Sequence, residues 1–155
     1  MRPLYELGAA ETVALLARGA VSSEAVVRAC LDRITDQEPR VQAWEFLDPE
    51  LALEQARRID RLTPRPPLAG LPVGVKDIID TADMPTACGS PVRRGHRPGA
   101  DASCVAALRA AGAVVLGKLV TPEFAYFSPG KTGTRATRRA RRVARRAARR
   151  RRSRI

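Results

Sequence analysis

The stretch that decides the fold is an apolar run leading into a lysine, Gly70-Leu71-Pro72-Val73-Gly74-Val75-Lys76-Asp77. A short apolar run that follows a proline-rich loop predicts a buried strand over residues 71–75. Lys76 would then lie at the carboxyl end of this strand, where open α/β sheets build their sites. Burial there would disfavour the charged amine, and a neutral amine can act as a general base. The alternative is a solvated lysine paired with Asp77 or Asp80.

Upstream of this strand, the pattern predicts three helices and one strand. Apolar residues at helical spacing indicate a helix over residues 9–18. Ser22 is a capping residue for a second helix, which Glu38-Pro39 should end. Residues 41–47 favour a strand, because they are rich in β-branched and aromatic side chains. Asp48-Pro49 then starts a third helix, whose inward face carries Ala52, Ala56 and Ile59.

Downstream, a helix and a second apolar run repeat the pattern. Asp101 is a candidate cap for a helix that continues to Ala111, and Gly112 would end it. Residues 113–116 are apolar and few enough for a buried parallel strand. The order strand, helix, strand predicts an α/β fold.

Charge divides the chain at about residue 131. Residues 132–155 hold 12 of the 28 basic residues and no acid, so residues 1–131 carry 16 basic and 16 acidic side chains and the tail accounts for the net charge of +12. We therefore expect residues 1–131 to form the folded portion and residues 132–155 to be an arginine-rich tail, disordered or an irregular helix. Affinity of the tail for nucleic acid would be non-specific.

Several blocks together resemble the amidase-signature family. The segment Gly70–Asp77 is similar to that around the family's catalytic lysine, which makes Lys76 the expected catalytic residue. The blocks that follow resemble those of the family in the same order, namely Met84-Pro85-Thr86-Ala87-Cys88-Gly89-Ser90, the run from Ala110 to Lys118, and Pro122-Glu123-Phe124-Ala125. The resemblance implies the first part of a mixed sheet flanked by helices, incomplete in these residues.

The resemblance also implies a reaction. In the family a neutral lysine takes a proton from a serine held in a cis peptide, and that serine activates a second serine for attack on an amide. The first serine lies in a Gly-Gly-Ser-Ser-type stretch after the Pro-Glu-Phe-Ala block, and residues 126–155 contain no such stretch. The resemblance therefore predicts a truncated amide hydrolase, inactive alone. Family members also include the amidotransferase component that releases ammonia from glutamine for transfer to mischarged tRNA, which remains an alternative.

The tail admits a further interpretation. If residues 142–150 are encoded by CGG GTG GCT CGT CGA GCG GCT CGG CGG, reading from two bases later gives Gly-Gly-Ser-Ser-Ser-Gly-Ser-Ala, the missing family motif. We therefore hypothesise a change of reading frame near residues 131–134. A genuine basic protein that binds nucleic acid through its tail is the competing hypothesis.

Other residues offer weaker candidates. His96 is the single histidine and lies in a Pro/Gly-rich loop, while Ser90 and Ser128 lie in turns. Cys88 could line the site or be a buried structural thiol. We expect no cofactor, no metal and no membrane contact, a small-molecule amide as substrate, and a cytoplasmic location with reduced cysteines. The sequence does not indicate an oligomeric state.

Overall fold

The computed structural model describes residues 2–126 and 131–132. The helices are η1 (Leu4–Glu6), α1 (Ala9–Ala17), α2 (Ser23–Val41), α3 (Pro49–Asp60), η2 (Pro91–Arg93), α4 (Ser103–Ala110) and η3 (Glu123–Ala125). The strands are β1 (Trp44–Leu47), β2 (Pro72–Lys76) and β3 (Val114–Leu119). The expected tail over residues 132–155 lies outside the described residues, except Thr132.

The three strands form one mixed sheet in the order β1-β3-β2. The central strand β3 pairs parallel with β2 and antiparallel with β1. Helix α4 lies between β2 and β3 in the chain, so these elements make the parallel strand-helix-strand unit that the sequence predicts. The α/β class and the mixed sheet are confirmed.

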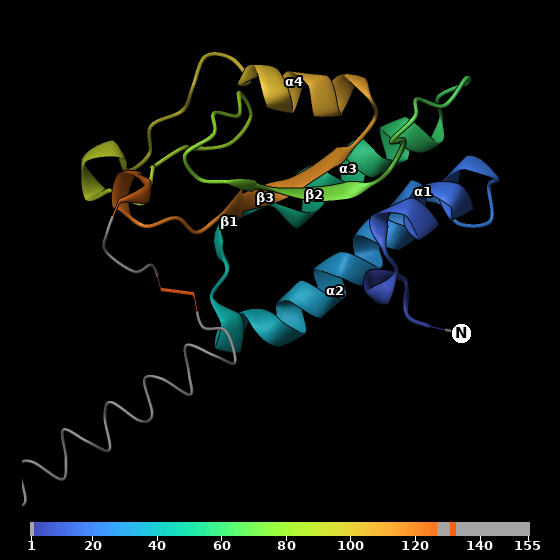
Figure 1. The fold of residues 1–155 in the computed structure, drawn as a ribbon, viewed down its shortest axis with the longest axis horizontal. Coiled ribbons are helices and arrows are strands. Elements are labelled where there is room, and N and C mark those ends of the chain that lie inside the picture. Colours follow the sequence, from blue (N-terminus) through green and yellow to red (C-terminus); the bar gives the residue numbers. More distant parts are fainter. Residues whose placement is uncertain (1, 127–130, 133–155) are drawn as a thin grey trace, which may run out of the picture.

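Helices cover both faces of the sheet, with α4 on one side and α2 and α3 on the other (Figure 1). Side chains of α2, α3 and β3 form one core cluster, made of Val27, Leu31, Ala52, Leu53, Ala56, Val114 and Leu116. A second cluster joins β2, β3, α4 and the loop after β2 through Val75, Met84, Val105 and Val115. Neighbouring residues of β3 thus enter opposite cores, as the alternation of a strand requires.

Two predicted helix starts are confirmed by their caps. The Ser22 side chain accepts a hydrogen bond from the amide of Ala25, and the Asp48 side chain accepts one from the amide of Leu51. The carboxylate of Asp60 adds two more bonds at the start of α2, from the amides of Ser23 and Glu24. These bonds satisfy amides that a helix start leaves without partners.

Two predicted helix boundaries are wrong, and the strand expected over residues 41–47 begins only at Trp44. The first is the end of α2, which does not lie at Glu38-Pro39 because the helix continues to Val41, with Gln42 as a left-handed cap at a φ of 53°. The Glu38 carboxylate accepts hydrogen bonds from the amides of Ala43 and Trp44, and so holds the chain as it leaves the helix.

The capping role expected of Asp101 is also wrong. Helix α4 begins at Ser103, and its N-cap Ala102 has no side-chain cap bond. The Asp101 carboxylate instead accepts a hydrogen bond from the amide of Ala82 at 2.8 Å and lies 3.1 Å from Nε of Arg109. It therefore ties the loop after β2 to α4.

The close approach of β1 to β3 depends on Gly117. A Cβ atom added at Gly117 would lie 2.3 Å from the carbonyl oxygen of Phe46, a backbone atom that cannot move without disturbing the strand pair. The ring of Trp44 lies 3.2 Å from the same position. No side chain larger than hydrogen fits there.

Gly117→Ala should lower the free energy of unfolding by about 1–3 kcal/mol, because the added methyl group overpacks the strand pair. Urea unfolding followed by the fluorescence of Trp44, the single tryptophan, measures the change. Gly99→Ala is the matched control, since nothing lies within 4 Å of a Cβ at Gly99. Equal unfolding free energies for the two variants would contradict the strand packing.

The three cysteines should react in a fixed order with iodoacetamide near neutral pH. Cys104 on α4 is exposed, Cys30 on α2 is intermediate and Cys88 is buried. Burial raises the pKa of the Cys30 thiol, so less of the reactive thiolate is present there. Mass spectrometry of timed samples should show Cys104 modified first. If Cys88 reacts as fast as Cys104 in the folded chain, the loop around Cys88 is not packed as described.

Candidate active site

The polar groups of the candidate site gather beyond the carboxyl ends of β2 and β3. Lys76 is the last residue of β2 and lies opposite Leu119 of β3. The loop that follows β2 leads to η2, and the segment that follows β3 leads to η3; these two short helices lie side by side at this end of the sheet (Figure 1). The position predicted for Lys76, at the end of a strand, is confirmed.

The expected burial of Lys76 is not observed. Its side chain is exposed, while its neighbours Val75 and Asp77 are 5% and 1% exposed. Alternation along the strand turns Lys76 away from the face that receives these two side chains. The pairing of Lys76 with Asp77 is not observed either, because the Asp77 carboxylate has another partner.

That partner is Lys118 on β3, a lysine with no exposed surface. Its Nζ atom lies 3.3 Å from Oδ1 of Asp77. The same ammonium group donates hydrogen bonds to the hydroxyl of Thr86 and, at 3.2 Å, to the carbonyl oxygen of Pro85. Burial lowers the pKa of Lys118, and the nearby charge of Asp77 opposes that shift. The buried lysine of this sheet edge is therefore Lys118 and not Lys76.

Asp77 joins β3 to the loop after β2. Its amide donates to the carbonyl of Leu119 at 2.8 Å, and its own carbonyl accepts from the amide of Cys88 at 2.9 Å. Its carboxylate lies 3.4 Å from the amides of both Ala87 and Gly89. One residue thus fixes the strand pair, the buried lysine and the loop.

The loop makes a tight turn at Cys88 and Gly89, with φ values of 55° and 65°. A Cβ atom at Gly89 would lie 2.5 Å from the carbonyl oxygen of Thr121, so only glycine allows the approach of this loop to the segment after β3. Cys88 is 7% exposed and belongs to this packing.

A second contact joins the loop to η3. The Ser90 hydroxyl donates to Oε1 of Glu123 at 2.5 Å, and the amide of Phe124 donates to the carbonyl of Cys88 at 2.8 Å. Phe124 and Ala125 have φ values of 47° and 57°, in the left-handed region that non-glycine residues seldom adopt. The interpretation of Ser90 as a turn residue agrees with its contacts, which also connect the two loops.

The other sequence candidates do not join this cluster. His96 is exposed, and its carbonyl accepts from the amide of Thr86. Ser128 lies outside the described residues. Among residues 2–126 and 131–132, no group of three or more His, Cys, Asp or Glu side chains could hold a metal ion. No helix within these ranges is long and apolar enough to cross a membrane.

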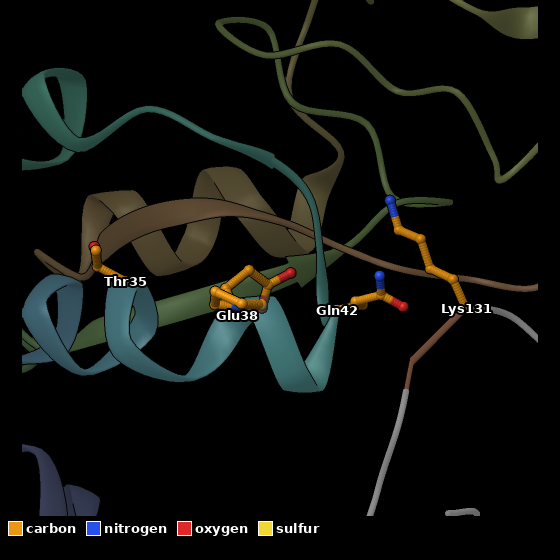
Figure 2. A pocket seen from close by; sticks show the side chains of 5 residues that line it. Thr35, Glu38, Gln42 and Lys131 are labelled. Atoms are coloured by element: carbon orange, nitrogen blue, oxygen red, sulfur yellow. The ribbon is translucent and has the colours of Figure 1, made fainter.

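An open cavity of about 500 Å³ lies along the last turns of α2 and is lined by Thr35, Glu38, Pro39, Gln42 and Lys131 (Figure 2). Its polar groups are largely engaged already. Glu38 binds the chain after α2, the Thr35 hydroxyl donates to the carbonyl of Leu31, and Lys131 lies 3.0 Å from Glu45. We do not assign the site to this cavity.

Lys118 and Glu123 are members of the site that the sequence pattern did not predict. A signal for Lys118 was present, because its charge closely follows the buried apolar residues 113–116. A charged residue in the continuation of a buried strand is expected to have a buried partner.

Comparison with known proteins identifies the family of the chain. The family model "Amidase" matches residues 25–145. In Salinispora arenicola, the A component of glutamyl-tRNA(Gln) amidotransferase is 46% identical over 129 residues, which cover 81% of this chain and 26% of that protein. The putative amidase AmiD of Mycobacterium bovis is 41% identical over 127 residues, which cover 79% of this chain and 27% of that protein. The chain thus spans about a quarter of the length of these relatives.

Solved structures show the same relationship. The native peptide amidase from Stenotrophomonas maltophilia matches with a TM-score of 0.74 and 38% sequence identity, over 84% of this chain and 28% of that chain. A fatty acid amide hydrolase matches with a TM-score of 0.72 at 24% identity, over 77% of this chain and 22% of that chain, which is a likeness of fold. The chain belongs to the amidase family, and its α/β fold is that of the amidase-signature enzymes.

Proposed function

We propose that residues 1–131 are the front portion of an amide hydrolase, with Lys76 in the position of the catalytic base. The observation that carries the proposal is the place of Lys76, at the carboxyl end of β2 and exposed beside two tightly bonded loops. A lysine there is open to a substrate and to further residues. The buried Lys118 is not open to either, because it has no exposed surface.

The proposed chemistry is that of the family. The amine of Lys76 takes the part of the base: it accepts a proton from a serine, which accepts the proton of a second serine as that serine attacks the amide carbonyl. The amine leaves with a proton, and water then hydrolyses the acyl-enzyme to give the carboxylate. No metal or cofactor takes part in this sequence of steps.

We propose that this chain alone is inactive, since the stretch that supplies the first serine is not among its 155 residues. The arginine-rich tail from residue 132 is then the product of a changed reading frame near residues 131–134. Support comes from the amino acids of residues 142–150, whose permitted codons include one set that reads as Gly-Gly-Ser-Ser-Ser-Gly-Ser-Ala when translation starts two bases later. Sequencing the gene across this region for those codons tests the frame change.

Two other functions remain as alternatives. Identity of 46% to a glutamyl-tRNA(Gln) amidotransferase component supports the first alternative, an amidotransferase component, whereas 41% identity to the putative amidase AmiD supports the amide hydrolase proposed above. The residues that choose between such substrates lie mostly beyond those described. A basic protein that binds nucleic acid through the tail has support only from the 12 arginines after residue 131. We propose a cytoplasmic location with reduced thiols.

Restoring the frame through the downstream gene should produce a chain that releases ammonia or amine from amides. Lys76→Ala in that chain should then lower kcat by at least about 100-fold, because it removes the general base. A panel of glutamine, short aliphatic amides and aryl amides, assayed for product release, measures the change.

His96→Ala is the control, because it removes the single histidine of the chain, an exposed side chain that could also accept a proton. We expect its kcat to stay within about twofold of the restored chain, since His96 makes its described contact through its backbone. An active restored chain whose kcat survives Lys76→Ala would refute the role given to Lys76.

A further inference from the structure

The least expected feature of the site is the buried pair of Asp77 and Lys118. We propose that Lys118 is a positioning residue for Lys76, because its bonds to Asp77, Thr86 and Pro85 hold the loop 85–90 against the carboxyl end of β2. The inference rests on the catalytic role proposed for Lys76, and it adds the residue that keeps the surroundings of Lys76 in place.

The contacts of Lys118 all lead to this end of the sheet. Two of its three partners, Pro85 and Thr86, are the first residues of the loop 85–90. The third, Asp77, immediately follows Lys76 in the chain. Thr86 itself has no exposed surface. Loss of the ammonium group would therefore remove one donor shared by the strand end and the loop.

Asp77 carries the effect into the backbone beside Lys76. Its carboxylate faces the amides of Ala87 and Gly89, and its main chain bonds Cys88 and Leu119. Without Lys118 the carboxylate would stay buried without its cation, and deleting one partner of a buried pair is strongly destabilising for that reason. Water could solvate that carboxylate only if the loop opens, because Asp77 is 1% exposed.

The buried ion pair differs from the rest of β3, whose buried side chains are apolar. Residues Val114, Val115 and Leu116 of the same strand fill the two cores with apolar side chains. A buried ion pair is often no more stabilising than apolar residues of the same volume. Its location under the loop, and not within the core clusters, points to a local role.

The groups that act on Lys118 all come from the segment that follows β2. They are Asp77, Asp80 and Cys88, all of which favour its charged form against the effect of burial. Cys88 is also a chemical reporter of the loop, because its buried thiol can be alkylated only when the loop opens.

The first test compares alkylation of Cys88 and Cys30 by iodoacetamide in the 155-residue chain and its variants. Cys30 on α2 is partly buried against the other core cluster, and it serves as the internal reference for changes outside the loop. Lys118→Met and Asp77→Asn should each raise the rate at Cys88 by at least about tenfold relative to Cys30, because they release the loop alone. Lys131→Met is the matched control, since Lys131 is an exposed lysine paired with Glu45, and it should change neither rate.

The second readout follows the backbone amide of Lys76 in protein labelled with ¹⁵N-lysine. The chain has three lysines, so the spectrum holds three lysine amides. Lys118→Met should shift or broaden the Lys76 signal and leave that of Lys131 in place. If Lys118→Met does not fold, the Lys76 signal is measured in Asp77→Asn, because asparagine keeps the size of the side chain and an oxygen acceptor.

Several results would overturn the proposal. They are an unchanged rate at Cys88, equal increases at Cys88 and Cys30, or an unchanged Lys76 signal in a folded variant. Failure of both variants to fold would also overturn it, since the pair would then serve the fold as a whole.

A kinetic arm separates this inference from the proposed function. In the frame-restored enzyme, Lys118→Met should lower kcat by about tenfold or more and leave KM within about twofold, because Lys118 does not touch substrate. A restored enzyme without activity would refute the proposed function, whereas the cysteine and NMR results would still decide whether Lys118 holds the loop.

Discussion

The parallel pairing of β2 with β3 decides where every polar group of the site lies. It sets Val75 opposite Lys118 and Lys76 opposite Leu119, so that the two lysines reach the same end of the sheet from adjacent strands. Alternation then exposes Lys76 and buries both Asp77 and Lys118. A slip of one residue in this register would exchange the exposed and the buried positions.

Much of the fold could be predicted because the relevant signals are local. Asp48 and Ser22 cap helices through bonds within three residues, and the apolar runs that end at Val75 and Leu116 lie in the strands expected of them. Local signals do not predict a helix boundary that depends on a contact with another part of the chain. Helix α2 continues through Pro39, and the Glu38 carboxylate binds the backbone just after the helix. Asp101, expected to cap α4, instead pairs with Arg109 and accepts a hydrogen bond from the amide of Ala82.

The site shows the same division. The position of Lys76 follows from the pattern of one strand, but its exposure depends on which neighbours cover it. Lys118 and Asp77 are far apart in the chain and meet only because β2 and β3 pair in parallel. Gln55 is a comparable case, since its buried amide bonds both backbone groups of Val115 from another element. Periodicity does not indicate such contacts.

The central claim is that this edge of the sheet presents Lys76 to solvent and buries Lys118 against Asp77. Acetylation of the native chain with a limiting amount of acetic anhydride, followed by mass spectrometry of each lysine, tests it most directly. The account predicts that Lys76 and Lys131 are modified while Lys118 is protected until the chain is unfolded. Modification of Lys118 at the rate of Lys131 in the folded chain would contradict it.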